Sequence, residues 1–169
     1  KIEHYIAQLL YRHQCVTVPG FGAFLTEIQS AQFNEVSNTF YPPKKLISFN
    51  SYLKNNDGLL ANHISLAEKM DYETAVQKIN EAVDSWKNSL DNYQPILLNN
   101  IGIIKMNFEG NLVFEAFSQV NYLAESFGLS SFISPLIKRE VLQQIEETPE
   151  AAPISIAPQT KSIPHFMRY

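Results

Sequence analysis

The chain has 169 residues, of which 45% are hydrophobic and 12% are aromatic. This composition supports a packed interior and excludes a globally disordered chain. The formal net charge of −4 argues against the basic character typical of nucleic-acid-binding domains, although a local basic patch stays compatible with it. The length allows one ordinary domain or two small ones that share a core.

The cysteine content and the hydropathy bear on the compartment. Cys15 is the only cysteine, so no internal disulfide can form, which suits a reducing compartment. No apolar run approaches the roughly 18 residues that a membrane-spanning helix needs, and the N-terminus lacks the pattern of a secretory signal. We expect a cytoplasmic portion, attached to a membrane only through a segment that is not present here.

The first part of the chain predicts one helix followed by strands. Apolar residues at helical spacing indicate an amphipathic helix over residues 2–13. The stretch that follows is typical of a β-hairpin over residues 16–28. Residues 29–45 are polar and aromatic and predict a long connection or an extended arm, after which LISF at 46–49 predicts the next strand.

Two helices are predicted next. Apolar residues at helical spacing over 59–70 form one face, and Asp71 favours the N-cap of the strongest helix, at 71–90. In this helix Val83 and Trp86 are expected to be buried.

The rest of the chain predicts two strands over 96–114, joined by a short turn, and a helical stretch near 119–127. Ser134-Pro135 is typical of a helix start and predicts a last helix over residues 134–147. Four prolines in residues 148–169 predict an extended, semi-rigid linker.

Two blocks of the sequence repeat in the same order. Each block contains a strand pattern that follows a helix, and Gly22 aligns with Gly102 at an offset of 80. The repeat predicts a duplicated unit of helix, hairpin, strand and helix. The aligned blocks are 16–24 with 96–104, and 46–50 with 111–115.

The motif VPGFGAF contains Gly20, Phe21 and Gly22 and resembles the Gly-Phe-Gly hairpin of the HU/IHF superfamily. Residues 71–86 are similar to that family's second helix. The blocks CVTVPGFGAF, FYPPKKLISFN and LKNNDGLL together resemble bacterial tandem HU-like domains. These are relatives of a eukaryotic centrosomal coiled-coil protein family and occur in membrane proteins that carry a SPOR domain.

The resemblance implies an α+β fold of two tandem HU/IHF-like domains, with helices and small antiparallel sheets, packed as a pseudo-dimer with an extended C-terminal tail. We expect the first domain over residues 1–58 and the second over 59–133, followed by the helix at 134–147 and the Pro-rich linker at 148–169. Helix 71–90 should then lie in the shared core.

The sequence also departs from the HU pattern. The first domain has room for one helix rather than two before its hairpin, and a tight turn at 109–111 replaces the arm of the second domain. HU arms bring Arg and Lys to DNA and a proline that wedges between base steps. Residues 26–43 contain neither Arg nor Lys.

The nucleic-acid-binding candidates are Pro42, Pro43, Lys44, Lys45 and Lys54. In one interpretation a proline wedges between bases while the lysines neutralise phosphates. In the other, the prolines fix an extended entry into the strand and the lysines are solvated. Two lysines neutralise at most two phosphates, too few for the steep salt dependence of strong binders.

Other chemistry is less well supported. His4, His13 and Cys15 lack the paired spacing of a structural zinc site, which favours a packed cysteine and surface histidines. No nucleophile has a base partner at motif spacing, so we expect no enzyme, no metal, no cofactor and no small-molecule substrate. Phe40 and Tyr41 could form an exposed protein-binding patch or fill the sheet.

Two functions follow from the sequence. The first is a non-enzymatic HU-like binding module that binds DNA, as the resemblance implies, in the cytoplasmic part of an inner-membrane-anchored, envelope- or division-associated protein. The alternative is a protein–protein interaction platform that has lost DNA binding. Self-association is expected through the HU-like core or the C-terminal tail.

Overall fold

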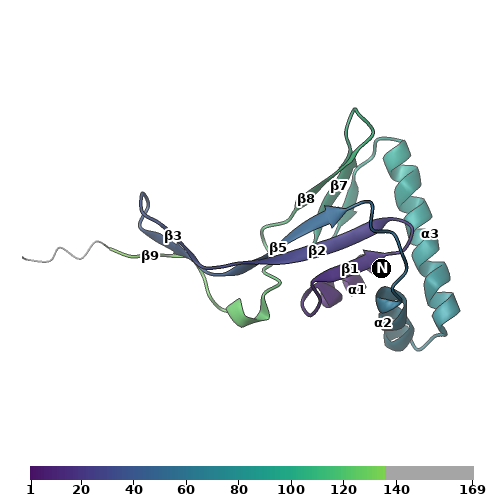
Figure 1. Ribbon diagram of the computed structural model, residues 1–169, viewed down its shortest axis with the longest axis horizontal. Helices are drawn as coiled ribbons and strands as arrows, with labels where there is room; N and C mark the ends of the chain where they lie inside the picture. Colours follow the sequence, from purple (N-terminus) through teal and green to yellow (C-terminus); the bar gives the residue numbers. More distant parts are fainter. Residues whose placement is uncertain (136–169) are drawn as a thin grey trace, which may run out of the picture. The chain divides into compact units, whose positions relative to one another are not determined.

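The computed structural model describes residues 1–135 (Figure 1). The linker expected at 148–169, and all but two residues of the helix expected at 134–147, lie outside the described residues. Within the described part the chain forms α-helices and small antiparallel sheets, which confirms the α+β class.

The first sheet has the strand order β1-β2-β5 and carries the arm. Helix α1 (Ile2–Leu10) precedes β1 (Cys15–Val18), β2 (Gly22–Gln29) and β5 (Lys44–Asn50). Strand β5 pairs with β2 along all seven of its residues, from the pair of Ala23 and Asn50 to the pair of Gln29 and Lys44, and the two strands continue past the helices to the arm, as Figure 1 shows. The hairpin predicted at 16–28 is therefore confirmed.

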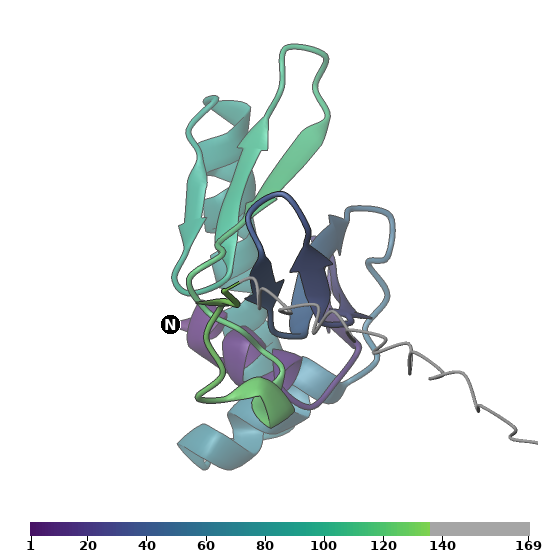
Figure 2. The ribbon, with the colours of Figure 1, turned by 90° about the vertical axis from the view of Figure 1, so that its left-hand side faces the viewer.

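The second sheet follows two helices and has no arm. It has the order β6-β7-β8 and consists of three short antiparallel strands. Figure 2 shows this sheet beside the strands of the first. The elements are α2 (Leu59–Glu68), α3 (Tyr72–Asp91), β6 (Ile96–Leu98), β7 (Gly102–Met106) and β8 (Leu112–Ala116).

A third sheet, here called the arm sheet, has the order β3-β4-β9. Strands β3 (Gln32–Asn34) and β4 (Thr39–Tyr41) form a hairpin between β2 and β5, and β9 (Phe132–Ile133) joins β4 from far along the chain. The sequence did not predict β9. The helix expected near 119–127 is wrong, because that stretch holds only the 3-10 turn Ala124–Ser126.

The two repeats, α1 to β5 and α2 to β8, have the same strand register. Val18 pairs with Gly22 in the first hairpin, and Leu98 pairs with Gly102 in the second. Both glycines are required for space: a Cβ on Gly102 would lie 2.3 Å from the backbone oxygen of Glu115. The predicted duplication is thus visible in the backbone pairing.

Both repeats bury their apolar residues in one hydrophobic cluster. The sheets meet at β5 and β8, where Phe49 and its repeat equivalent Phe114 lie with ring centroids 6.3 Å apart. Val83 is buried as expected, whereas Trp86 is only half-buried and packs at the rim of the core against Phe21. Trp86 was expected to be buried, and the structure places it against the core but leaves it partly exposed.

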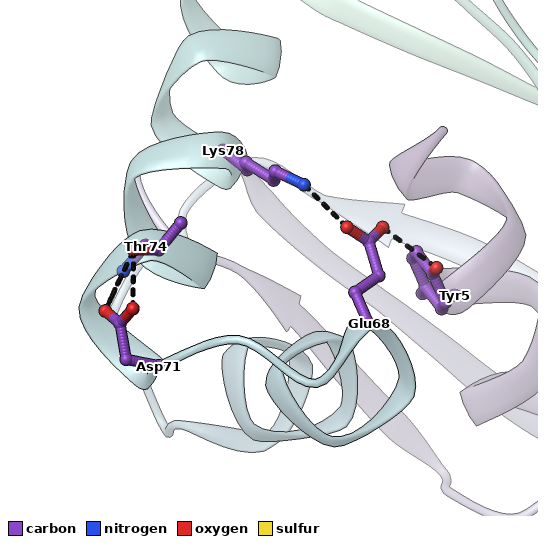
Figure 3. A network of polar contacts seen from close by, with 5 residues as sticks. All are labelled: Tyr5, Glu68, Asp71, Thr74 and Lys78. Carbon is purple, nitrogen blue, oxygen red and sulfur yellow. Dashed lines mark hydrogen bonds and ion pairs between the residues drawn. The ribbon is translucent and has the colours of Figure 1, made fainter.

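A polar network connects the three helices (Figure 3). The Glu68 carboxylate of α2 accepts a hydrogen bond from the Tyr5 hydroxyl of α1 at 2.9 Å and pairs with the Lys78 ammonium of α3 at 2.6 Å. The Lys78 and Tyr5 hydrogen bonds lower the pKa of Glu68. Asp71 caps α3 by accepting from the Thr74 backbone N–H at 2.8 Å, so the predicted N-cap is confirmed.

Tyr122 links the segment after β8 to the second hairpin and gives the fold a pH dependence. Its side chain is 1% exposed, and its hydroxyl donates to the Asn100 carbonyl at 2.8 Å. Burial raises the pKa of Tyr122 to about 12, above its ordinary value of 10.0. A group with a raised folded pKa contributes its full stability below pH 10, and that contribution is lost as the pH rises from 10 through 12.

We therefore expect Tyr122→Phe to lower the free energy of unfolding by about 1 kcal/mol at neutral pH, because one hydrogen bond is lost. This deficit should shrink as the pH rises above 10, since the variant lacks the titrating hydroxyl. Urea titrations across this range measure the difference, with Tyr52→Phe as control because Tyr52 is 90% exposed. A deficit that stays constant with pH would contradict this assignment.

Candidate functional site

Lys45 faces the interior of the fold. Its ammonium donates to the carbonyls of Leu10 at 2.9 Å and Tyr11 at 3.0 Å, at the C-terminal end of α1. Burial lowers the pKa of Lys45, and the nearby Glu125 opposes that shift. The carbonyls at a helix C-terminus attract cations. The Lys45 side chain therefore connects strand β5 to the end of helix α1.

Lys44 and Lys54 are exposed but lie apart. Lys44 begins the seven-residue strand β5, and Lys54 lies beyond its far end, so roughly 20 Å of strand separates them. The backbone carbonyl of Lys54 accepts from Gly20 N–H at 3.0 Å, which ties this loop to the first hairpin. The structure therefore does not bring the three lysines together.

The charges on the outer faces of the two sheets are balanced. Glu27 lies on the same face as Lys44 and diagonal to it, because it is two residues along β2 from Gln29, the residue that pairs with Lys44. On the second sheet Lys105 is paired with Glu115. Neither face therefore offers the surplus of cations that binding to a phosphate backbone requires.

Pro42 and Pro43 lie at the base of the arm, between β4 and β5, and are half-buried. The Asn121 side chain holds them in place: its amide donates to the Pro43 carbonyl at 2.9 Å and accepts from the Lys45 backbone N–H at 3.2 Å. A cavity of about 580 Å³ lies beside this bridge and is lined by residues that include Lys44. The two prolines immediately precede strand β5 and do not lie at the tip of the arm.

Three phenylalanines form an exposed row across the arm sheet, here called the aromatic ladder. Phe33 pairs with Phe40, and Phe40 pairs with Phe132, so the three side chains lie on one face. The ring centroids of Phe33 and Phe40 are 4.4 Å apart, and those of Phe40 and Phe132 are 5.1 Å apart. The exposed fractions are 47% for Phe33, 38% for Phe40 and 59% for Phe132.

The arm sheet carries no charged residue in any of its three strands. Phe40 thus belongs to an exposed apolar patch, while its neighbour Tyr41 faces the opposite side of the sheet. The sequence pointed to Phe40 and Tyr41 but not to Phe33 or Phe132. The alternation of β3 could have indicated Phe33, whereas nothing local indicated Phe132.

The hairpin motif has a structural role. Gly20 adopts φ +74°, a left-handed conformation that favours glycine, and Gly22 leaves room for Phe49 of the neighbouring strand. Phe21 is buried and packs against Phe49 and Trp86. The motif therefore shapes the core and presents no binding group.

The histidines do not gather into a metal centre with Cys15. In residues 1–135 no group of three or more His, Cys, Asp or Glu side chains is placed to hold a metal ion. His63 Nε2 lies 2.9 Å from the Gln8 side-chain oxygen, and the Gln8 nitrogen lies 3.1 Å from His4 Nε2. Burial lowers the pKa of His63, which favours its neutral form.

None of the helices in the described part is long and apolar enough to cross a membrane.

Comparison with known families covers both repeats. Residues 1–57 match the family described as CCDC81-like prokaryotic HU domain 1, and residues 58–127 match CCDC81-like prokaryotic HU domain 2. Searches of curated proteins and of solved structures gave no match. The two family matches agree with the duplicated register and with the shared core, and they cover most of the 169 residues. The chain belongs to the family of tandem CCDC81-like prokaryotic HU domains.

Proposed function

We propose that this tandem HU-like pair is a non-enzymatic protein-interaction module whose arm contacts a protein partner rather than DNA. HU-like domains indicate a module for binding nucleic acid or protein in general. The observation that carries the choice between them is the arm sheet, which exposes three phenylalanines and has no charged residue in its strands.

The lysines support the same choice. Of the three candidates, Lys45 is engaged with the end of α1, and Lys44 and Lys54 are separated by the length of β5. The arms of DNA-binding HU proteins act through Arg and Lys on the phosphate backbone. An aromatic arm sheet without charged residues in its strands is better suited to an apolar protein surface, because exposed apolar patches commonly mark protein interfaces.

The cellular setting is part of the proposal. The resemblance to proteins that combine tandem HU-like domains with a SPOR domain supports a cytoplasmic position in an envelope- or division-associated membrane protein. The single Cys15 is consistent with a reducing compartment.

A DNA titration tests the choice of ligand. With a labelled duplex, we expect binding weaker than about 100 µM at roughly 200 mM salt, since few phosphates can be neutralised. The double substitution Lys44→Glu with Lys54→Glu should leave the anisotropy curve unchanged. Lys45 is left intact because its substitution would disturb the fold itself.

Micromolar binding whose salt slope falls by about two units in the Lys44→Glu, Lys54→Glu variant would show that these lysines contact phosphates. That outcome would restore DNA binding and overturn the protein-interaction proposal.

A further inference from the structure

The arm sheet has an unprotected edge at β3. Because the strand order is β3-β4-β9, the outer side of β3 has no neighbouring strand in the described structure. Exposed edge strands are commonly protected by lysine, proline, a bulge or a covering segment. The three residues of β3, Gln32 to Asn34, are all exposed and include no lysine or proline. This edge is therefore open to pairing.

The backbone groups of Phe33 point toward the free edge. Ser134 N–H donates to the Asn38 carbonyl, which sets the direction of the Asn38 backbone toward the β9 side. The backbone N–H and C=O groups of successive strand residues point alternately to the two sides of the strand. Those of Thr39 and Tyr41 therefore point toward β3, where these residues pair with Asn34 and Gln32. Phe33 lies between Asn34 and Gln32, so its backbone N–H and C=O point away from β4, toward the free edge of β3.

The opposite edge of the arm sheet is less suited to pairing. Strand β9 has two residues and is followed within two positions by Pro135, which has no backbone N–H to donate. The aromatic ladder also has an end at β3, where the ring of Phe33 contacts Phe40 and has no further aromatic neighbour in the described part of the chain. A strand added at β3 could extend the ladder and bond the backbone together.

We propose that β3 pairs with β3 of a second copy of this chain, antiparallel and about a two-fold axis at Phe33. The inference rests on the proposed function, because it names the protein partner of the arm. In this register Phe33 lies opposite Phe33 of the second copy, and the two copies exchange the outward backbone hydrogen bonds of these residues. The two aromatic ladders then join into one continuous row.

The neighbouring residues in this register are compatible with self-pairing. Gln32 lies opposite Asn34 of the second copy. The Asn34 side-chain oxygen already accepts from the Val36 and Ser37 backbone N–H groups, so the Asn34 NH2 group is the one that can donate to the Gln32 side-chain oxygen. Glu35, the nearest charged residue, lies opposite Ala31 rather than Glu35 of the second copy. No like charges are therefore brought together, as they would be in many edge-to-edge pairings.

Cysteine cross-linking tests both the contact and its register in the full 169-residue chain. In a Cys15→Ser background, Phe33→Cys places two thiols opposite each other at a Cα separation of about 5.5 Å, within the range of a disulfide. Val36→Cys is the matched control: Val36 is 96% exposed, but the pairing holds the two copies of this residue roughly 20 Å apart.

We expect a covalent dimer from the Phe33→Cys chain under mild oxidation and little from the Val36→Cys chain. Random collision would give the reverse order, because Val36 is twice as exposed as Phe33. Equal or greater cross-linking through Val36→Cys would overturn the proposal. Thermal melts of both variants establish that they are folded.

Sedimentation equilibrium tests the same contact with the Phe33 ring in place. We expect the unmodified chain to dimerise with a Kd of about 10 to 100 µM, in keeping with a small interface. Phe33→Lys should raise this Kd at least about tenfold, and Val36→Lys should not. A chain that stays monomeric and does not bind DNA overturns self-pairing alone, whereas salt-dependent DNA binding through Lys44 and Lys54 overturns the proposed function.

Discussion

Gly102→Ala should destabilise the protein by about 3 kcal/mol, because the added methyl group has no space between β7 and β8. Its Cβ would lie 2.3 Å from the backbone oxygen of Glu115 and 2.7 Å from the Phe114 ring. A flexible side chain can move away from such a contact, but a backbone carbonyl within a sheet cannot move without separating the strands. Phe114 also joins the two sheets, so the strain reaches the shared core.

The melting temperature should fall by roughly 6 to 12 °C for a chain of this size. Gly110→Ala is the matched control, because nothing lies within 4 Å of a Cβ at that position. Gly110 has φ +80°, so the control measures the cost of the left-handed backbone alone, about 1 kcal/mol. A Gly102→Ala loss no larger than that of Gly110→Ala would contradict the role of close strand approach.

The duplicated fold could be predicted because each repeat carries the same local signals. Apolar residues recur at the same strand positions, and the glycine that admits the crossing phenylalanine recurs as Gly22 and Gly102. The left-handed turn position also recurs, as Gly20 at φ +74° and Asn100 at φ +66°. Asparagine tolerates this conformation better than most residues, so the turn is kept although the glycine is not.

The segment after β8 could not be predicted in the same way. A helical stretch was predicted near 119–127, but Asn121 accepts from the Leu123 backbone N–H at 3.0 Å and donates to the Pro43 carbonyl. A side chain that bonds the backbone two residues ahead competes with helix formation. Strand β9 is too short for a periodic signal, and it is defined only by its pairing with β4, about 90 residues earlier.

The candidate nucleic-acid site was predicted from its residue types, the prolines and lysines. The geometry of strand β5 then places its two adjacent lysines on opposite faces of the sheet. Lys44 and Lys45 are adjacent in sequence, yet successive residues of a strand point to opposite faces. Recognising residues 46–49 as a strand was not enough, because the strand begins two residues earlier, at Lys44. Extending the alternation back by two positions would have assigned one lysine to solvent and the other to the interior.

This difference between neighbouring lysines leads to a large expected effect. Lys45→Glu should lower the free energy of unfolding by about 2 to 3 kcal/mol, because two charge-assisted hydrogen bonds to the end of α1 are lost. The new carboxylate would also face the negative end of the helix and lie near Glu125. Lys44→Glu makes the same change of charge on an exposed side chain and should alter stability by less than about 0.5 kcal/mol.

Chemical denaturation of the two variants side by side measures the contrast, and Lys45→Met separates its causes. Methionine keeps much of the aliphatic stem but cannot donate to Leu10 and Tyr11, so it should lose part of the stability that Lys45→Glu loses. Equal losses for Lys44→Glu and Lys45→Glu would mean that the ammonium of Lys45 does not hold α1 to the sheet. That result would return Lys45 to the set of lysines available for a ligand. The case against phosphate binding at the base of the arm would then rest on the diagonal pair of Glu27 and Lys44 and on the arm sheet, whose strands carry no charged residue.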